Sequence, residues 1–135
     1  IFVVARNNGA GVGMILGPAA VNNQIRYENP TQILSVGVGN GLSSITSTIG
    51  DNHVHHSLSI RYDGVTWEVW RDGVLASSTP EGVTGPLTLG RLGSWFSGQF
   101  GLNGDVAEVM VYDVALSPAQ REAVEDYLRT KYALP

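Results

Sequence analysis

The sequence contains no cysteine, so disulfide bonds and thiolate metal sites are excluded, and the folded state depends on its core. Charged residues make up only 15% of the chain, and the eight Lys and Arg are scattered from Arg6 to Lys131. With a net charge of −4, the chain has no basic patch for a phosphate backbone. Nucleic acid is therefore not expected as a partner.

Long apolar runs are also missing. No stretch approaches the roughly 18 consecutive apolar residues that a membrane-spanning helix needs, so we expect no membrane insertion. The first residues, "IFVVARNNG", lack the basic region and the cleavage site of a secretory signal peptide. Because the chain starts at Ile1 within an apolar, β-branched run, we interpret it as a segment of a longer polypeptide.

Glycine and apolar residues, by contrast, are abundant. Seventeen glycines among 135 residues indicate many turns, and 43% hydrophobic residues indicate an ordered core. A chain of this length suits one folding unit. The sequence therefore predicts a single, mostly β domain over residues 1–135.

Segments rich in Val, Ile and Thr recur between clusters of Gly, Asn, Asp and Pro, a pattern typical of an antiparallel β-sandwich. We expect strands near residues 1–6, 13–17, 22–28, 31–39, 56–63, 66–72, 74–79, 85–91 and 104–113. Two Asp-Gly pairs, at residues 63–64 and 72–73, lie between extended runs and suit tight hairpins. Residues 57–77 should thus form a three-stranded meander. Within it, Trp67 and Trp70 fall on opposite faces, so one of them is either covered by another segment or exposed to a partner.

The periodicity changes at Ser117. An N-cap at Ser117, Pro118 at the first helical position and Gln120 in a capping box predict a helix over about 117–132. Its apolar residues recur at steps of three and four: Ala123, Val124, Tyr127, Leu128 and Tyr132. We expect this stripe to pack on a sheet. The residues expected in solvent are Arg121, Glu125, Arg129 and Lys131.

Two carboxylates, Asp105 and Glu108, precede this helix. A retaining glycosidase needs two carboxyl groups about 5 Å apart on one side, whereas residues three apart on a regular strand face opposite sides. Apolar residues on both faces of this strand predict a central strand, in which Glu108 is partly buried beside Arg61 or Arg71. We assign no catalytic residue.

Metal ligands are sparse. His53 and His55 share a strand face, but a closed metal site needs three or four ligands, so we interpret both as structural or exposed. A calcium site built from Asp51, Asn52 or Asp105 stays open as an alternative, although no dense Asp-x-Asp loop supports it. The sequence predicts no metal site and no cofactor.

A Gly- and Ser-rich stretch, "GRLGSWFSGQFG", contains Trp95 and Phe96. An exposed aromatic ring there can stack on a sugar or anchor a protein partner. With Arg91, these residues form the predicted ligand-binding surface. The alternative is that one or both rings fold inward and cap the sandwich.

Three stretches, "HHSLSIRYDGVTWEVWRDGVLASSTP", "GPLTLGRLG" and "NGDVAEVMVYDVALSPAQREAVEDYLRTKY", resemble the laminin-G-like jelly rolls of the concanavalin A-like lectin and glucanase superfamily. The similarity covers about Phe2 to Tyr132 and is closest to bacterial and phage-type modules. It implies an all-β, two-sheet antiparallel jelly-roll sandwich with one C-terminal α-helix. A first strand bearing an "FDG"-type motif would be missing before Ile1.

The resemblance also implies a class of function. Members of the family bind glycans or proteins, some through a calcium ion, and the superfamily includes glucanases. We therefore expect a non-catalytic carbohydrate-binding or adhesion module of a larger surface or secreted protein, whose partner is a glycan or a surface protein. One alternative is a structural decoration or fibre module that contacts neighbouring chains; another is a glycoside hydrolase. The expected location is extracellular, on a cell surface or on a virion surface.

Overall fold

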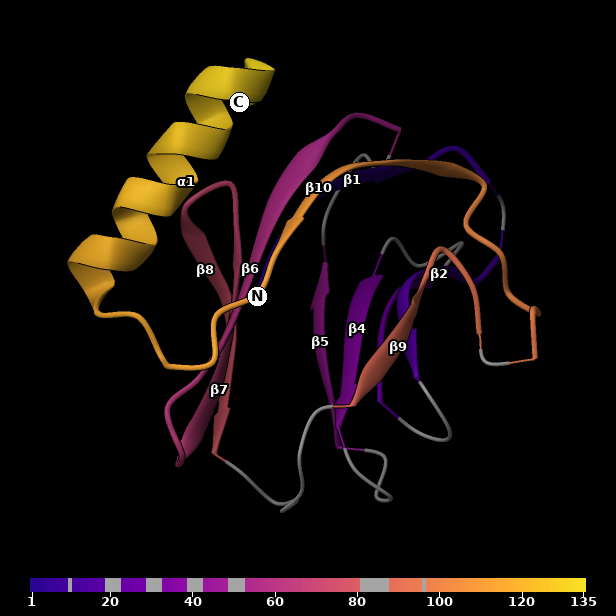
Figure 1. The fold of residues 1–135 in the computed structure, drawn as a ribbon, viewed down its shortest axis with the longest axis horizontal. Helices are drawn as coiled ribbons and strands as arrows, with labels where there is room; N and C mark the ends of the chain where they lie inside the picture. Colours follow the sequence, from indigo (N-terminus) through magenta and orange to yellow (C-terminus); the bar gives the residue numbers. More distant parts are fainter. Residues whose placement is uncertain are drawn as a thin grey trace.

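The computed structural model describes residues 1–9, 11–18, 23–28, 33–38, 43–48, 53–80, 88–95 and 97–135. Two antiparallel five-stranded sheets face one another, and a single described helix lies outside the pair (Figure 1). The predicted all-β arrangement of two sheets with a C-terminal helix is confirmed at this level.

The first sheet has the order β10-β1-β6-β7-β8. Its strands are β1 (Phe2–Asn7), β6 (His56–Tyr62), β7 (Thr66–Arg71), β8 (Val74–Pro80) and β10 (Gly104–Met110). β6, β7 and β8 pair in sequence order, which confirms the meander. Among the described strands β10 lies at the edge of this sheet, so the prediction that it is a central strand is wrong.

The second sheet has the order β5-β4-β3-β2-β9. Its strands are β2 (Gly13–Pro18), β3 (Gln24–Glu28), β4 (Ile33–Val38), β5 (Ser43–Thr48) and β9 (Leu89–Leu92). The sequence did not predict β5, because "SSITST" has one apolar residue and no alternation. Its six residues nevertheless pair with all six of β4, so tertiary pairing overrides the weak local pattern.

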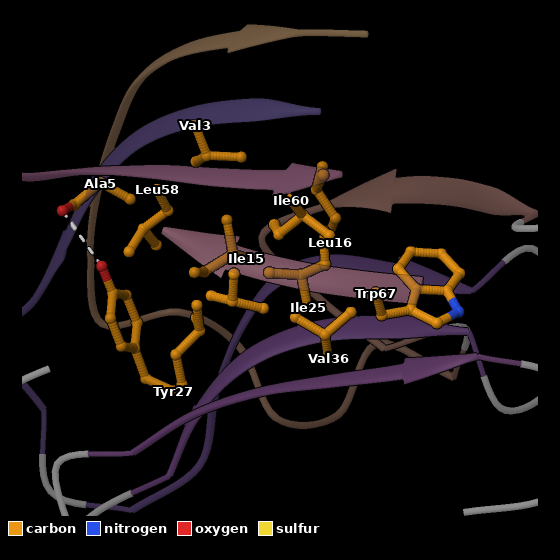
Figure 2. Packing of buried hydrophobic residues seen from close by; sticks show 12 residues of the cluster. Val3, Ala5, Ile15, Leu16, Ile25, Tyr27, Val36, Leu58, Ile60 and Trp67 are labelled. Atoms are coloured by element: carbon orange, nitrogen blue, oxygen red, sulfur yellow. Dashed lines mark hydrogen bonds between the residues drawn. The ribbon is translucent and has the colours of Figure 1, made fainter. Parts of the chain in front are cut away.

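The core lies between the two sheets and takes side chains from both (Figure 2). Its buried members are Val3, Ala5, Ile15, Leu16, Ile25, Tyr27, Leu34, Val36, Leu58, Ile60, Trp67 and Val69. Full burial of one such aliphatic side chain contributes about 1.5–3 kcal/mol. The hydroxyl of Tyr27, on the second sheet, donates to the carbonyl of Ala5 on the first at 3.1 Å and so links the sheets across the core (Figure 2).

The hairpin between β7 and β8 is closed by a carboxylate. Asp72 Oδ1 accepts a hydrogen bond from the amide of Ser57 at 2.9 Å, and Asp72 Oδ2 lies 2.7 Å from Nδ1 of the buried His56. Asp72 has a φ of 49° and the next residue, Gly73, a φ of 79°, as the predicted Asp-Gly turn requires. This turn is therefore attached to the start of β6.

The helix α1 (Pro118–Tyr132) begins as predicted. The amide of Gln120 donates to Ser117 Oγ at 3.3 Å, and the amide of Ser117 donates to Gln120 Oε1 at 3.0 Å. These two bonds confirm the capping box. The helix ends at Ala133, whose φ of 49° places it in the left-handed region.

The buried face of α1 differs from the predicted stripe. Arg121 and Glu125, expected in solvent, are only 5% and 2% exposed, whereas Tyr127, expected in the stripe, is 49% exposed. Leu128 is buried as predicted, and Val124 and Tyr132 are partly buried beside it. The helix therefore presents charged residues as well as apolar ones to the sheet.

The sheet surface beneath the helix explains this burial. Glu125 Oε1 accepts a hydrogen bond from Ser59 Oγ of β6 at 2.6 Å, and Glu125 Oε2 accepts one from Arg121 Nη1. The Arg121 guanidinium lies over the ring of Trp70, with Cζ 3.6 Å from the ring centroid. Ser59 thus offers a hydroxyl that needs an acceptor, and Trp70 offers an aromatic face on which a cation can stack. An apolar helix stripe would provide neither partner. Trp70 is the tryptophan that another segment covers.

β1 is buried on both faces because it lies between the core and the helix. Val3 and Ala5 belong to the core, while Phe2 and Val4 pack against Leu128 of α1. A strand covered on two sides needs apolar residues at consecutive positions, which "FVVA" provides.

We expect Glu125→Gln to lower the free energy of unfolding by about 3 kcal/mol, because it removes the buried carboxylate that neutralises Arg121 and leaves only the exposed Glu122 as a charged partner. Urea denaturation measures this change. Glu122→Gln is the matched control: this carboxylate also pairs with Arg121, but its side chain is 64% exposed, so the change should stay below about 1 kcal/mol. Equal losses in the two variants would contradict the account.

Tyr27 gives the fold a dependence on alkaline pH. Burial, and to a smaller extent the charge of Asp72, holds the pKa of Tyr27 well above its usual value of 10.0. Above pH 10 the unfolded chain releases this proton while the folded chain keeps it. The free energy of unfolding therefore falls as the pH rises through that range.

We expect wild type to lose stability relative to Tyr27→Phe above pH 10, by up to about 1.4 kcal/mol per pH unit. Near pH 7 the variant should be less stable by about 1 kcal/mol, because the Ala5 carbonyl loses its donor. Urea denaturation from pH 7 to pH 11 measures both effects. If the free energies of unfolding of the two proteins changed with pH in the same way, the pH dependence would not come from Tyr27.

Candidate binding loop

The segment 93–102, here named the aromatic loop, leads from β9 towards β10 and is attached to β2. The amide of Gly93 donates to the carbonyl of Ile15, and the amide of Met14 donates to the carbonyl of Phe100, each at 2.9 Å. The amide of Leu102 donates back to the carbonyl of Gly93 at 2.9 Å. Both ends of the loop are thus fixed to the second sheet and to each other.

The tip of the aromatic loop is a tight turn. The amide of Trp95 donates to the carbonyl of Gln99 at 2.9 Å, and the amide of Gly98 donates to the carbonyl of Trp95 at 2.8 Å. Gly98 adopts a φ of 81°, which a β-carbon disfavours. At the base, the Ser94 carbonyl lies so close to Gly17 that a β-carbon there would be only 2.0 Å from its oxygen. These contacts restrain the described residues of the loop on both sides of Phe96.

The predicted site residues fall in and beside this loop. Trp95 is partly buried, and its ring meets the ring of Phe100 edge to face, with centroids 6.4 Å apart. Arg91 is exposed on the neighbouring strand β9. Phe96 lies outside the described residues. The structure thus brings Trp95 near an aromatic residue that the sequence had not singled out.

Phe100 is the residue that sequence reasoning missed. It is 51% exposed and has a φ of 52°, a left-handed conformation in which a bulky residue is a backbone outlier. Such a conformation costs on the order of 1 kcal/mol and persists only where the surroundings impose it. Here the amide of Met14 donates to the Phe100 carbonyl and attaches this residue to β2. In the sequence, Phe100 between Gln99 and Gly101 has no feature that distinguishes it from a buried aromatic residue.

Polar side chains stand beside the two rings. Ser97 Oγ lies 3.2 Å from Gln99 Oε1, and both residues are exposed. Together with Arg91, the aromatic loop offers ring faces, a hydroxyl, an amide and a guanidinium on one short segment. These groups suit a ligand with an apolar face and several hydroxyl groups.

The carboxylates of β10 are not arranged as the sequence predicted. The register between β1 and β10 shifts, so that Ala107 is an extra residue: Arg6 faces Asp105, and Val4 faces Glu108. Arg6 and Val4 are two apart on β1, so both carboxylates lie on the same face of the sheet, not on opposite faces. Asp105 Oδ2 is bound by Arg6 Nε at 2.5 Å.

The partner of Glu108 is also different from the two that were predicted. Glu108 Oε2 pairs with Lys131 Nζ of α1 at 3.1 Å, while Arg61 pairs with Glu68 at 3.0 Å. Hydrogen bonds with the Tyr127 hydroxyl and with Glu108 hold the pKa of Lys131 above its usual range. Glu108 therefore ties the helix to the edge strand, which is a structural role.

The residues considered as metal ligands are dispersed or lie outside the described residues. His53 is exposed and His55 partly buried, while Asp51 and Asn52 lie outside the described residues. In the ranges that the structure describes, no three His, Cys, Asp or Glu side chains form a group that could hold a metal ion. Within those same ranges, no helix has the length and apolarity needed to cross a membrane.

We expect Phe100→Gly to change the free energy of unfolding by less than about 1 kcal/mol, because relief of backbone strain offsets the lost ring contact. A phenylalanine in a packed core would cost about 3–5 kcal/mol on truncation. Thermal and urea denaturation distinguish these outcomes. A loss in the larger range would mean that Phe100 supports the fold and is not held for recognition.

Comparison with known proteins assigns no family: no family model matches the chain, and no curated protein or solved structure is significantly similar to it.

Proposed function

We propose that this domain is a non-catalytic binding or adhesion module and that Trp95, Phe100 and Arg91 contact a glycan. The observation that carries the proposal is Phe100, a half-exposed aromatic residue held in a strained conformation beside Trp95. An exposed ring gains little from burial in the fold, so a strained one points to a role in recognition.

The chemistry of the aromatic loop fits a sugar. Aromatic rings stack on the apolar face of a pyranose, and the side chains of Ser97, Gln99 and Arg91 can hydrogen-bond its hydroxyl groups. The backbone bonds that fix the loop reduce the entropy lost on binding. Such a preformed surface favours recognition over chemistry.

We also propose a laminin-G-like jelly roll as the fold family and a larger extracellular, cell-surface or virion-surface protein as the context. The resemblance of residues 53–132 to that family supports this proposal, as do the two five-stranded antiparallel sheets and the closing helix. The phage-type likeness makes the virion surface one of the locations.

A second candidate, an assembly module that contacts neighbouring chains, is favoured by β8. This strand lies at the edge of its sheet and is exposed at six of its seven positions, including Val74 and Leu75. It carries no charged residue of the kind that usually protects an edge from pairing.

A glycan array tests the first proposal. Wild type should bind at least one glycan class, and Trp95→Ala and Phe100→Ala should each weaken binding by about 1–3 kcal/mol, a loss of roughly tenfold or more. Tyr127→Ala is the control, because Tyr127 is an exposed aromatic residue on α1, outside the loop.

Binding that survives both loop substitutions would place the site elsewhere. A protein that binds no glycan and sediments as an oligomer would instead support the assembly module.

A further inference from the structure

The basic side chains of this protein are, with one exception, neutralised within the molecule. Those with a carboxylate oxygen within 3.6 Å are Arg6, Arg26, Arg61, Arg71, Arg121, Arg129 and Lys131. The exception is Arg91, whose guanidinium has no carboxylate of a described residue within ion-pair distance. This is notable in a chain with twelve acidic and eight basic residues. The charge of Arg91, an exposed residue, is therefore available to a ligand.

The segments around Arg91 carry no other charge. In the sequence, Arg91 is the only charged residue between Glu81 and Asp105, and this interval includes the whole aromatic loop. The adjacent strand β2, with the sequence "GMILGP", has no charged residue either. Nearby carboxylates would compete for a guanidinium, whereas neutral neighbours leave its attraction for an anion intact. This part of the surface therefore favours a negatively charged group.

A bulge turns Arg91 to the outer face of the second sheet. β9 lies beside β2 (Figure 1), and in their register Leu89 faces Pro18 while Arg91 faces Gly17, so Gly90 is an extra residue. Leu89 packs against the core. Residues that face each other in a strand pair share a side of the sheet, and Pro18 and Gly17 are consecutive. Arg91 therefore points away from the core, on the opposite side from Leu89.

The aromatic loop starts on the same outer face. The Ser94 carbonyl oxygen lies only 2.0 Å from the position that a β-carbon on Gly17 would occupy, so the loop passes over the residue that faces Arg91. Paired strands are about 4.8 Å apart, a distance that an arginine side chain spans. Trp95 follows Ser94 directly, and its ring meets that of Phe100. The guanidinium and the two rings thus belong to one surface.

We propose that the glycan recognised by the aromatic loop is anionic, a sugar that carries a carboxylate or a sulfate, and that Arg91 binds this group and determines the specificity. The inference rests on the proposed function, because it takes the aromatic loop as the glycan site. A guanidinium donates two parallel hydrogen bonds to a pair of oxygens on such a group, and these charged bonds are stronger than bonds to a neutral hydroxyl. The rings of Trp95 and Phe100 pack on the sugar ring that bears the anionic group.

The experiment measures binding to immobilised oligosaccharides in matched pairs: an oligogalacturonate with its methyl ester, and a sulfated galactan oligosaccharide with its desulfated form. At least one anionic member should bind about tenfold or more tightly than its neutral partner, because only the anionic form offers a charged acceptor to Arg91. Loss of binding on esterification assigns the carboxylate, and loss on desulfation assigns the sulfate. Binding should also weaken as sodium chloride is raised.

Arg91→Gln should reduce binding of the anionic member about tenfold or more and bring it to the level of the neutral member. Arg129→Gln is the matched control, because it removes the same charge from a partly exposed arginine on α1, outside the loop. It should bind as wild type does.

Two outcomes separate this inference from the function on which it rests. If anionic and neutral members bind equally and both are lost in Trp95→Ala, the glycan site stands and the anionic specificity is wrong. Unchanged binding by Arg91→Gln would have the same meaning. If no oligosaccharide binds, or if binding survives Trp95→Ala and Phe100→Ala, the proposed function and this inference fail together.

Discussion

The position of the helix depends on one buried ion pair. Arg121 and Glu125 pair on the sheet-facing side of α1, where Glu125 accepts a hydrogen bond from Ser59 and Arg121 stacks on Trp70. A 15-residue helix is marginal by itself in water, so its stability comes from this contact and from the apolar residues around Leu128. Once the helix is docked, the chain between β10 and Ser117 must follow a short path.

The candidate binding surface depends on the second sheet. The aromatic loop is bonded to β2 of that sheet, and Arg91 lies on β9, which pairs with β2. A loop fixed in this way loses little entropy on binding, which is why the proposed glycan site is placed there.

Local sequence signals predicted the elements better than the contacts between them. Three features depend on residues that are neighbours in the sequence: the Asp-Gly turns, the alternating pattern of residues 56–71 and the capping box. Each is present in the structure. The buried face of α1 could not be predicted, because apolar periodicity gives no weight to an arginine that stacks on a distant tryptophan. The shared face of Asp105 and Glu108 depends on a bulge, and Phe100 is attached to β2 by a bond from Met14. These contacts join residues that are far apart in the chain, so no local sequence pattern predicts them.

The three tryptophans offer a direct test of where this protein recognises its ligand, because each indole reports a different place. Trp67 lies in the core, Trp70 lies under Arg121, and Trp95 belongs to the aromatic loop. The measurement is the shift of the three indole N–H resonances during titration with the glycan that binds best in an array. Recognition by the aromatic loop predicts that the Trp95 resonance moves and that those of Trp67 and Trp70 stay in place. A shift of the Trp67 or Trp70 resonance while the Trp95 resonance stays in place would contradict recognition by the aromatic loop.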